Sequence, residues 1–486
     1  MKTSISPVLI TFALVCFALV QNAQAVSPAP DGGYPGGNTA EGQNALLFLS
    51  NGGFNTAVGF DALWNNNTGS FNTAIGAGAL FVNTGDQNTA TGVGALLDNS
   101  TGADNTANGT LALFGNTTGS RNVAVGTNAL SNNYSGDDNT AVGFQALADS
   151  IVGQNTALGS QALFSNVEGH DNTAAGYLAL SFNIGDPSSG AGNWNSAFGS
   201  YALSNSIGAF NCAFGFNALL NNTTGNANTA MGSAALVSNT TGSNNTAVGV
   251  DAFGNNTTGT NNTAIGGSAL DENTTGNNNA ALGLAALSHS TTGNDNTVVG
   301  SFAGSDVTTA NGVICIGNGV AGANVSNTTW IGNVYGTTTQ SGTTAPVIVS
   351  DSGQLGTVAS SERFKKDIST MHEASEAILS LRPVTFHYKS DVKETPQFGL
   401  VAEEVAMVNP ALVLPDKEGK PYSVRYDAVN AMLLNEFLKE HRRVEELEAN
   451  AARQQKQIEA LIVGLQKMSA QLEVSSRAQQ TVLNSQ

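Results

Sequence analysis

A short repeat dominates this sequence and constrains its fold more than any other feature. The tripeptide Asn-Thr-Ala, or a close variant, recurs sixteen times at a spacing of 16 or 17 residues, with one longer step of 23 residues. The repeats begin at Asn38, Asn55, Asn72, Asn88, Asn105, Asn122, Asn139, Asn155, Asn172, Asn195, Asn211, Asn228, Asn245, Asn262, Asn279 and Asn296. Such self-similarity is typical of a stacked architecture in which each unit contacts only its neighbours.

Each unit reads Asn-Thr-Ala-Φ-Gly-x-x-Ala-Leu, where Φ is usually apolar, and then enters a polar turn such as Asn67-Thr68-Gly69. Glycine after Φ permits a sharp bend because it lacks a Cβ atom, and Asn and Gly in the second turn tolerate positive φ. We therefore predict two short strands and two turns per unit, which make one coil of a parallel β-solenoid (β-roll). The apolar side chains of stacked coils are expected to share one narrow core.

The abundance of asparagine has a predicted structural cause. Asparagines at equivalent positions of stacked coils can hydrogen-bond along a ladder, as they do in cross-β assemblies. About 16 coils over residues 38–317 predict a rod of about 75–80 Å at ~4.8 Å per coil. Because a coil of 17 residues encloses very little core, we expect several chains to associate.

The distribution of charge divides the chain near residue 360. Lys2 and Arg121 are the only basic residues before that position, whereas residues 360–486 hold the other 16 Lys and Arg and 18 of the 36 acidic residues. The net charge of −18 argues against nucleic acid as a partner, because phosphate contacts require clustered Lys and Arg. Residues 318–359, rich in Gly, Thr and Ser, are interpreted as a neck or linker between two different segments.

The N-terminus has the pattern of a secretory signal peptide. Lys2 precedes an almost wholly apolar run from Val8 to Val20, and the small-residue site Ala23-Gln24-Ala25 follows. Residues 1–25 are therefore predicted to be a cleaved signal, and residues 26–37 a linker. No later segment is long and apolar enough to span a membrane, so we expect a secreted or cell-surface protein.

The repeats from Asn38 to Gly317 resemble the head repeats of trimeric autotransporter adhesins, which carry short Asn-Ser-Val-Ala-Ile-Gly units in a β-roll. The repeat in this chain is longer than the repeat of that family. The resemblance implies a homotrimeric stalk that serves in adhesion or as a spacer.

Beyond the neck, four blocks follow one another in sequence. They read Ser-Ser-Glu-Arg-Phe-Lys-Lys-Asp-Ile at 360–368, Leu-Arg-Pro-Val-Thr-Phe-His-Tyr-Lys at 381–389, Phe-Gly-Leu-Val-Ala-Glu-Glu-Val at 398–405 continued by Asn-Pro-Ala-Leu-Val at 409–413, and Tyr-Ser-Val-Arg-Tyr-Asp-Ala-Val at 422–429. In this order they resemble the intramolecular chaperone auto-processing domain that ends phage tailspikes, endosialidases and membrane-bound myelin regulatory transcription factors. The resemblance covers residue 360 to about residue 447. It implies a small α+β domain, placed at 360–430, that registers three chains of a spike and then removes itself.

In that family a serine–lysine dyad lies in a Ser-Asp-x-Arg-Leu-Lys motif. The resemblance assigns the nucleophile to Ser360 and the general base to Lys365, five positions later. Ser361 replaces the Asp of the motif, and Phe364 replaces its Leu. The Ser360 hydroxyl is expected to attack the carbonyl of Ala359, giving an ester that water opens. The predicted activity is that of a serine endopeptidase that acts once and in cis.

The last segment has the periodicity of a coiled coil. Seam positions follow alternating steps of three and four: Val444, Leu447, Ala451, Gln454, Ile458, Leu461, Leu465, Met468 and Leu472. This heptad pattern predicts a long helix from about Tyr426 to Val474, a coiled coil over residues 431–475 and a tail over 476–486. The seam residues do not determine how many chains associate. The expectation of three chains comes from the resemblance to the chaperone auto-processing domain.

Together these features predict a mainly β, exported, homotrimeric fibre with a C-terminal trimerisation chaperone and a surface glycan or another extracellular ligand as partner. The alternatives are a non-cleaving solenoid that binds ice or a polysaccharide, and a glycan-degrading spike with paired acids. Acidic residues occupy no single recurring column of the repeats, and His170 and His289 are isolated. Neither a metal nor a cofactor is therefore predicted.

Overall fold

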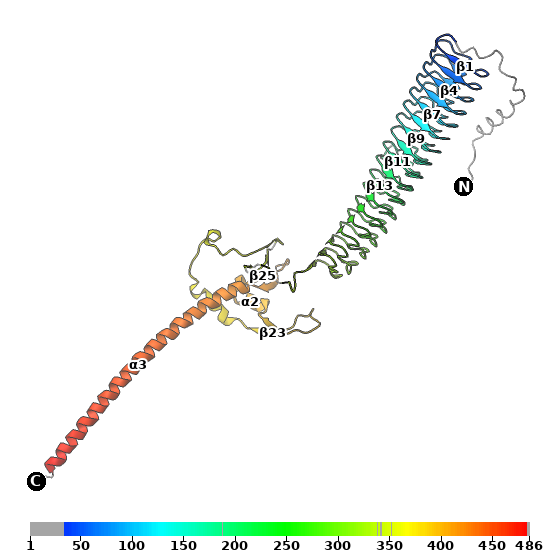
Figure 1. Cartoon of the computed structure of the whole chain (residues 1–486). Coiled ribbons are helices and arrows are strands. Elements are labelled where there is room, and N and C mark those ends of the chain that lie inside the picture. The colour runs from blue at the N-terminus through cyan, green and yellow to red at the C-terminus, as the bar shows by residue number, and fades with distance from the viewer. Residues whose placement is uncertain (1–33, 187, 338, 341–342, 351, 484–486) are drawn as a thin grey trace. The chain divides into compact units, whose positions relative to one another are not determined.

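The computed structural model describes residues 34–483 except 187, 338, 341–342 and 351. The predicted signal peptide and most of the linker that follows it lie outside the described residues. The chain divides into two compact units, residues 1–340 and 341–486. The predicted fold class is confirmed, because a parallel β-solenoid is followed by a small domain of helices and antiparallel hairpins and by a long C-terminal helix (Figure 1).

The first unit is built on one parallel sheet, with 18 strands in its described part. Each coil contributes one three-residue strand, and neighbouring strands pair in register, so that Ala57 lies between Ala40 and Ala74. The strands are β1 (Thr39–Glu41), β2 (Thr56–Val58), β4 (Thr73–Ile75), β6 (Thr89–Thr91), β7 (Thr106–Asn108), β8 (Val123–Val125), β9 (Thr140–Val142), β10 (Thr156–Leu158), β11 (Thr173–Ala175), β12 (Ser196–Phe198), β13 (Cys212–Phe214), β14 (Thr229–Met231), β15 (Thr246–Val248), β16 (Thr263–Ile265), β17 (Ala280–Leu282), β18 (Thr297–Val299), β19 (Ile314–Ile316) and β20 (Thr329–Ile331).

The second side of each coil is a turn rather than the predicted strand. Ala62 and Leu63 are consecutive, and both are fully buried. A pleated strand cannot place consecutive side chains on one face. The backbone instead takes positive φ at Asp61 (54°) and Leu63 (51°), which turns both side chains inward. Outside the main sheet, the described solenoid has one short strand pair, β3 (Asn65–Asn66) with β5 (Val82–Asn83).

The core of the solenoid contains fewer side chains than its apolar pattern suggests. It consists mainly of the two alanines and the leucine of each coil, stacked on their equivalents along the whole unit. The Φ side chains lie outside this core: Val58 is 36 % exposed and Ile75 is 43 % exposed. Because Ala57 points inward, its two neighbours in the strand must point outward.

The predicted asparagine ladder is confirmed, and it reaches the backbone. The Asn72 backbone N–H donates to Oδ1 of Asn55 at 2.9 Å, and Asn55 Nδ2 donates to the Gly69 carbonyl at 2.9 Å. A second ladder flanks the same turn: Asn83 Nδ2 donates to Oδ1 of Asn66 at 2.9 Å, and Asn66 Nδ2, like that of Asn55, donates to the Gly69 carbonyl. These side chains are fully buried, so they supply hydrogen bonds that the narrow core requires.

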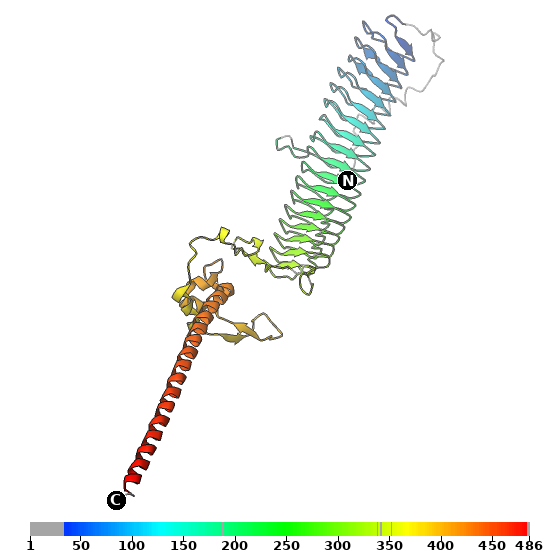
Figure 2. The same cartoon turned by 60° about the vertical axis from the view of Figure 1, so that its left-hand side comes forward.

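The regular stack changes at two places. Asp186 and residues 188–192 belong to the longer step in the repeat, and they leave the rod as a loop (Figure 2). At the C-terminal end, β20 pairs with β19, so the sheet extends one coil beyond the predicted limit at Gly317.

The second unit combines short helices, hairpins and one long helix. The elements are β21 (Ile348–Val349), β22 (Leu355–Gly356), η1 (Glu362–Phe364), η2 (His372–Ser380), β23 (Val384–Phe386), β24 (Gln397–Gly399), α2 (Ala402–Val408), η3 (Pro410–Leu412), β25 (Val413–Pro415), β26 (Pro421–Val424) and α3 (Tyr426–Leu483). Its core is small: among the described residues, its buried apolar side chains are Val405, Leu412, Val424 and Met432.

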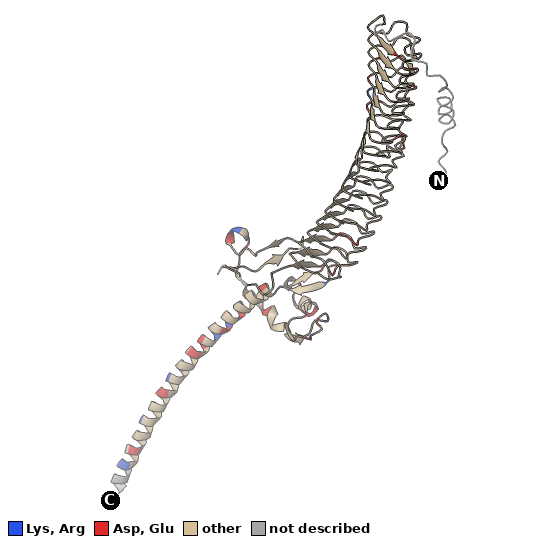
Figure 3. Ribbon diagram, turned by 45° about the vertical axis from the view of Figure 1, so that its right-hand side comes forward, with Lys and Arg blue, Asp and Glu red and all other residues tan. Residues whose placement is uncertain are grey.

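Helix α3 begins at the predicted residue and continues nine positions beyond Val474. Charged side chains of both signs are distributed along it, whereas the solenoid carries sparse and almost only acidic charges (Figure 3). The seam residues Leu461 and Leu465 are more than 60 % exposed in the single chain. The helix is thus confirmed, whereas its pairing with other chains stays a prediction.

Candidate functional site

Ser360 and Lys365 flank the short helix η1. Ser360 lies one residue before Ser361, the N-cap residue in extended backbone, and the N–H of Lys365, the C-cap residue, donates to the Glu362 carbonyl at 2.9 Å. Both side chains are exposed, and no hydrogen bond joins them in the described structure. The Arg363 guanidinium lies 4.7 Å from the centre of the Phe364 ring. The two residues of the predicted dyad therefore lie at the two ends of η1, and their side chains are not hydrogen-bonded to each other.

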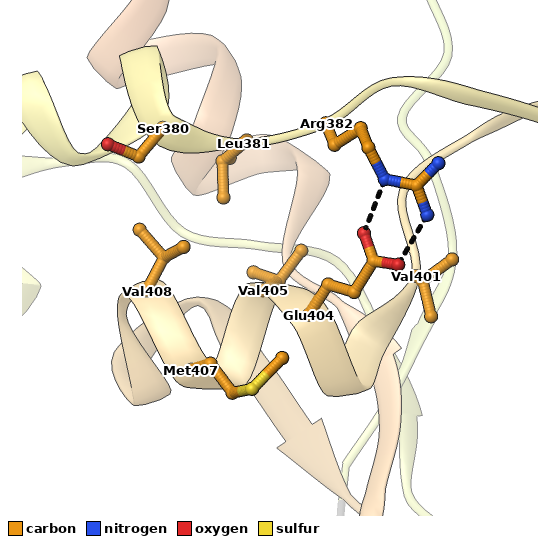
Figure 4. Close-up of a pocket in the computed structure, with 8 residues that line it drawn as sticks. All are labelled: Ser380, Leu381, Arg382, Val401, Glu404, Val405, Met407 and Val408. Atoms are coloured by element: carbon orange, nitrogen blue, oxygen red, sulfur yellow. Dashed lines mark hydrogen bonds and ion pairs between the residues drawn. The ribbon is translucent and has the colours of Figure 1, made fainter.

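The second and third sequence blocks meet through an ion pair. Arg382 Nε donates to Oε2 of Glu404 at 3.1 Å, and Arg382 Nη2 donates to Oε1 at 2.5 Å (Figure 4). The guanidinium lowers the pKa of the Glu404 carboxyl, mainly through these bonds. A bidentate pair fixes orientation as well as charge, so it holds α2 against the segment that leads into β23.

A cavity of about 400 Å³ lies beside this pair. Its walls come from Ser380 at the end of η2, from Leu381 after it, and from Val405, Met407 and Val408 on α2 (Figure 4). Met407 is 80 % exposed. Neither this cavity nor the ion pair was found by sequence reasoning, because residues 22 positions apart meet only in the folded domain.

The third and fourth blocks meet at Tyr426. Its hydroxyl accepts a hydrogen bond from the Leu400 N–H at 3.0 Å. A Cβ atom at Gly399 would lie 2.7 Å from the same hydroxyl, so glycine is required for this approach. An apolar cavity of about 640 Å³ lies between β23, β24 and α3, with Phe398 and Leu433 among its lining residues. The second, third and fourth blocks are thus neighbours in the folded unit.

A polar cluster joins η2 to α3 and was also missed by sequence reasoning. The buried Ser375 hydroxyl donates to the Glu436 carboxylate and accepts from Asn435 Nδ2 at 2.7 Å. Lys439 Nζ lies 2.8 Å from Glu436 and 3.2 Å from Glu376. Hydrogen bonds from Lys439 and Ser375 lower the pKa of Glu436, whereas those carboxylates raise the pKa of Lys439. The cluster fixes the start of α3 against the small domain.

No group of three or more His, Cys, Asp or Glu side chains suitable for a metal ion occurs among the described residues. Within that same part of the chain, no helix has the length and hydropathy needed to cross a membrane. Cys212 and Cys315 are both free thiols.

Comparison with protein families identifies the C-terminal unit. Residues 360–414 match the family model described as chaperone of endosialidase. The matched segment begins at Ser360 and contains the first three blocks, so the predicted C-terminal chaperone domain is confirmed. Neither a curated protein nor a solved structure matches the chain. The resemblance of the repeats to adhesin heads and the predicted domain limit at residue 430 stay predictions.

Proposed function

Since residues 360–414 form a domain of the chaperone-of-endosialidase family, we propose that the chain is an exported homotrimeric fibre. In this proposal the solenoid is the stalk and the C-terminal domain is a trimerisation chaperone. The chaperone then cleaves itself from the stalk next to Ser360. The family match on the C-terminal side of a long parallel solenoid is the observation that carries the proposal.

The solenoid has a folding problem that such a chaperone addresses. Nearly identical coils pair almost equally well one step out of register, and parallel pairing of distant segments is slow. A C-terminal nucleus that holds several chains together would set their register before the stalk forms. This gives a physical reason for joining the two units in one chain.

The surface of the chaperone unit supports association. Phe398 is 81 % exposed and Tyr422 is 76 % exposed in the single chain, while the buried apolar core is very small. Exposed apolar surface of this kind marks an interaction site. Together with the exposed seam of α3, it is what a subunit of a homo-oligomer presents before assembly.

The stalk also presents exposed apolar side chains, arranged in a column. From β8 to β20 the Φ position is apolar in every coil and points outward. These residues are Val125, Val142, Leu158, Ala175, Phe198, Phe214, Met231, Val248, Ile265, Leu282, Val299, Ile316 and Ile331. A partner with the same ~4.8 Å repeat, running parallel, can cover this column along its whole length. A second copy of the chain meets that requirement.

The proposed cleavage is an acyl transfer. The Ser360 hydroxyl attacks the Ala359 carbonyl carbon while Lys365 accepts the hydroxyl proton. The Ala359–Ser360 C–N bond then breaks, its nitrogen takes a proton, and an ester to Ser360 Oγ remains. Water hydrolyses the ester, leaving a carboxylate on Ala359 and the free Ser360 hydroxyl. Because the two side chains are exposed and separate in the single chain, we expect the dyad to assemble only when chains associate.

The test is expression of residues 26–486 beside three variants, Ser360→Ala, Lys365→Met and Ser361→Ala. Denaturing gels and mass spectrometry should show a fragment that begins at Ser360 in the wild type and in Ser361→Ala, but not in the other two. An intact wild-type chain in a folded trimer would contradict cleavage. Light scattering on the same samples tests the trimer separately.

Export is proposed on the N-terminal sequence pattern alone. Expression of the full chain in a bacterium with a secretory pathway, followed by N-terminal sequencing of the product, should give a mature chain beginning at Val26. Retention of Met1 in the cytoplasmic fraction would contradict the proposal.

One observation favours a second candidate function, a regular-surface binder. The Thr of Asn-Thr-Ala points outward in most coils, and Thr56, Thr73 and Thr140 lie partly exposed beside the Φ column. Repeated hydroxyls at ~4.8 Å spacing suit a repeating ligand such as ice or a polysaccharide. Thermal hysteresis measured on the cleaved stalk tests the ice-binding form, and replacement of Thr140 and Thr156 by Val tests the assigned face.

A further inference from the structure

A cavity of about 440 Å³ opens on the side of the solenoid, in the turn that follows the buried leucine of each coil. We call it the notch. Its lining includes Phe114 and Phe164, together with Ser131 and Ala148 from the two coils between them. The four residues occupy the same position of successive coils, directly after Leu113, Leu130, Leu147 and Leu163. The notch therefore lies where two consecutive coils carry small side chains between two coils that carry rings at this position.

Backbone hydrogen bonds establish the alignment. The N–H groups of Gly115, Asn132 and Asp149 donate to the carbonyls of Ser131, Ala148 and Phe164, at 2.9, 2.9 and 3.0 Å. Phe114 and Phe164 are thus three coils apart, or roughly 14 Å at ~4.8 Å per coil. In an earlier part of the same column, Trp64 and Phe81 stack with ring centres 4.8 Å apart. Two further ring-sized layers therefore fit between Phe114 and Phe164.

Polar side chains surround the gap. Asn128 and Gln145 line it from the preceding turn, and Asn132 Nδ2 donates to Oδ1 of Asp149 at 2.8 Å. Asp98 lines it as well, and burial raises the pKa of its carboxyl. Tyr134 completes the wall and is 55 % exposed. The notch thus combines aromatic side chains, amides that donate and accept, and carboxylates that accept hydrogen bonds.

We propose that the notch binds a short segment of a neutral saccharide chain. Sugar rings present apolar C–H faces that pack on aromatic side chains, and hydroxyls that pair with amides and carboxylates. None of the lining residues is Lys, Arg or His, so the site lacks the cations that an anionic sugar or a phosphate requires. The volume lies in the range of small-ligand sites.

The proposal rests on the proposed function, in which the solenoid is the stalk of an exported fibre, and it gives that stalk a ligand class and a place. It does not require cleavage, because the notch lies wholly in the first unit. Binding and not hydrolysis is inferred: Asp98 and Asp149 are three coils apart, roughly 14 Å, whereas the paired acids of glycosidases stand about 5–10 Å apart.

The test is calorimetric titration of the chain comprising residues 26–486 with neutral oligosaccharides of two to four sugars. Cello-, chito-, malto- and manno-oligosaccharides form the panel, and oligogalacturonates serve as anionic probes. The decisive variant is Ser131→Phe, which fills the notch with a ring that other coils carry at this position. The matched control is Ser288→Phe, at the equivalent position of a distant coil.

At least one neutral oligosaccharide should bind the wild type and Ser288→Phe with the same affinity. Its affinity for Ser131→Phe should be lower by roughly tenfold or more. Phe164→Ala and Asn128→Ala should weaken binding while leaving the circular dichroism spectrum unchanged. The proposal is overturned if no neutral sugar binds at about 10 mM, if Ser131→Phe binds as the wild type does, or if the anionic probes bind best. If Ser131→Phe, and not Ser288→Phe, disrupts the oligomer, the notch is occupied by a second copy of the chain. That result would also overturn the proposal. The trimer and the cleavage are measured separately, so the binding result can be interpreted even if either of them is absent.

Discussion

The backbone N–H of Asn262 donates a hydrogen bond of 3.0 Å to the side-chain Oδ1 of Asn245, one coil earlier. The same Asn245 side chain donates through Nδ2 to the Gly259 carbonyl at 2.8 Å. One buried amide thus satisfies a backbone donor and a backbone carbonyl of the same turn, one coil later. Repetition of this arrangement along the unit explains why asparagine, rather than another polar residue, occupies the position.

Replacement of Asn245 by Ala should destabilise the solenoid. It leaves the Asn262 N–H buried without this acceptor, and an unsatisfied buried group costs about 1–3 kcal/mol. The Gly259 carbonyl loses one of its two amide donors and keeps Asn256 Nδ2 at 3.1 Å. The control is Asn255→Ala, at an exposed position of the same repeat. Chemical unfolding followed by circular dichroism should show a lower midpoint for the first variant alone. Equal midpoints would contradict the role assigned to the ladder.

Two adjacent glycines should respond differently to alanine. Gly266 has φ of +133°, and a Cβ atom there would lie 2.3 Å from the Gly283 carbonyl oxygen of the next coil. At Gly267 the nearest atom, Cδ1 of Leu284, would lie 3.4 Å away. Gly266→Ala is therefore expected to open the stack and lower the unfolding midpoint, whereas Gly267→Ala should be nearly neutral. The same circular dichroism measurement checks both, and a neutral Gly266→Ala would refute the close-approach argument.

The seam of α3 should control association. Leu465 and Val463 are both exposed apolar residues of this helix, but only Leu465 belongs to the heptad seam. Leu465→Asp would bury a carboxylate in each chain of a coiled coil, which is unfavourable without a partner. We expect Leu465→Asp to shift the mass measured by light scattering toward the monomer, with Val463→Asp unchanged. Identical masses for both variants would argue against the predicted seam.

The cluster at Glu436 should make the C-terminal unit sensitive to acid. Its folded-state pKa lies below the ordinary value of 4.5, so the folded state binds fewer protons than the unfolded state at this group. Its contribution is full above that value and is lost as pH falls through the lowered pKa. Thermal melts of the wild type should therefore drop below about pH 4.5, and Glu436→Gln should flatten this dependence. Glu440→Gln, exposed on the same helix, should leave the dependence unchanged.

The predictions from sequence were confirmed where a structural feature depends on the regular spacing of residues along the chain. The spacing of Asn38 and its equivalents determines one coil per repeat, and stacking then places the asparagines in a ladder. The heptad spacing from Val444 to Leu472 determines a helix for the same reason. The order of the C-terminal blocks was sufficient to recognise the chaperone domain, although not to show whether Ser360 and Lys365 meet.

Features that depend on side-chain direction, or on contacts between distant residues, were decided only by the tertiary structure. The motif Φ-Gly-x-x-Ala-Leu does not reveal that Leu63 turns inward through positive φ or that Val58 faces outward. Likewise, the Arg382–Glu404 pair and the notch between Phe114 and Phe164 join residues from different coils or segments. The sequence by itself determined the periodic stack, because a repeated unit can bury its apolar residues only against its neighbours. Only the folded chain decided which face each residue serves, because that depends on local backbone angles and on packing between segments.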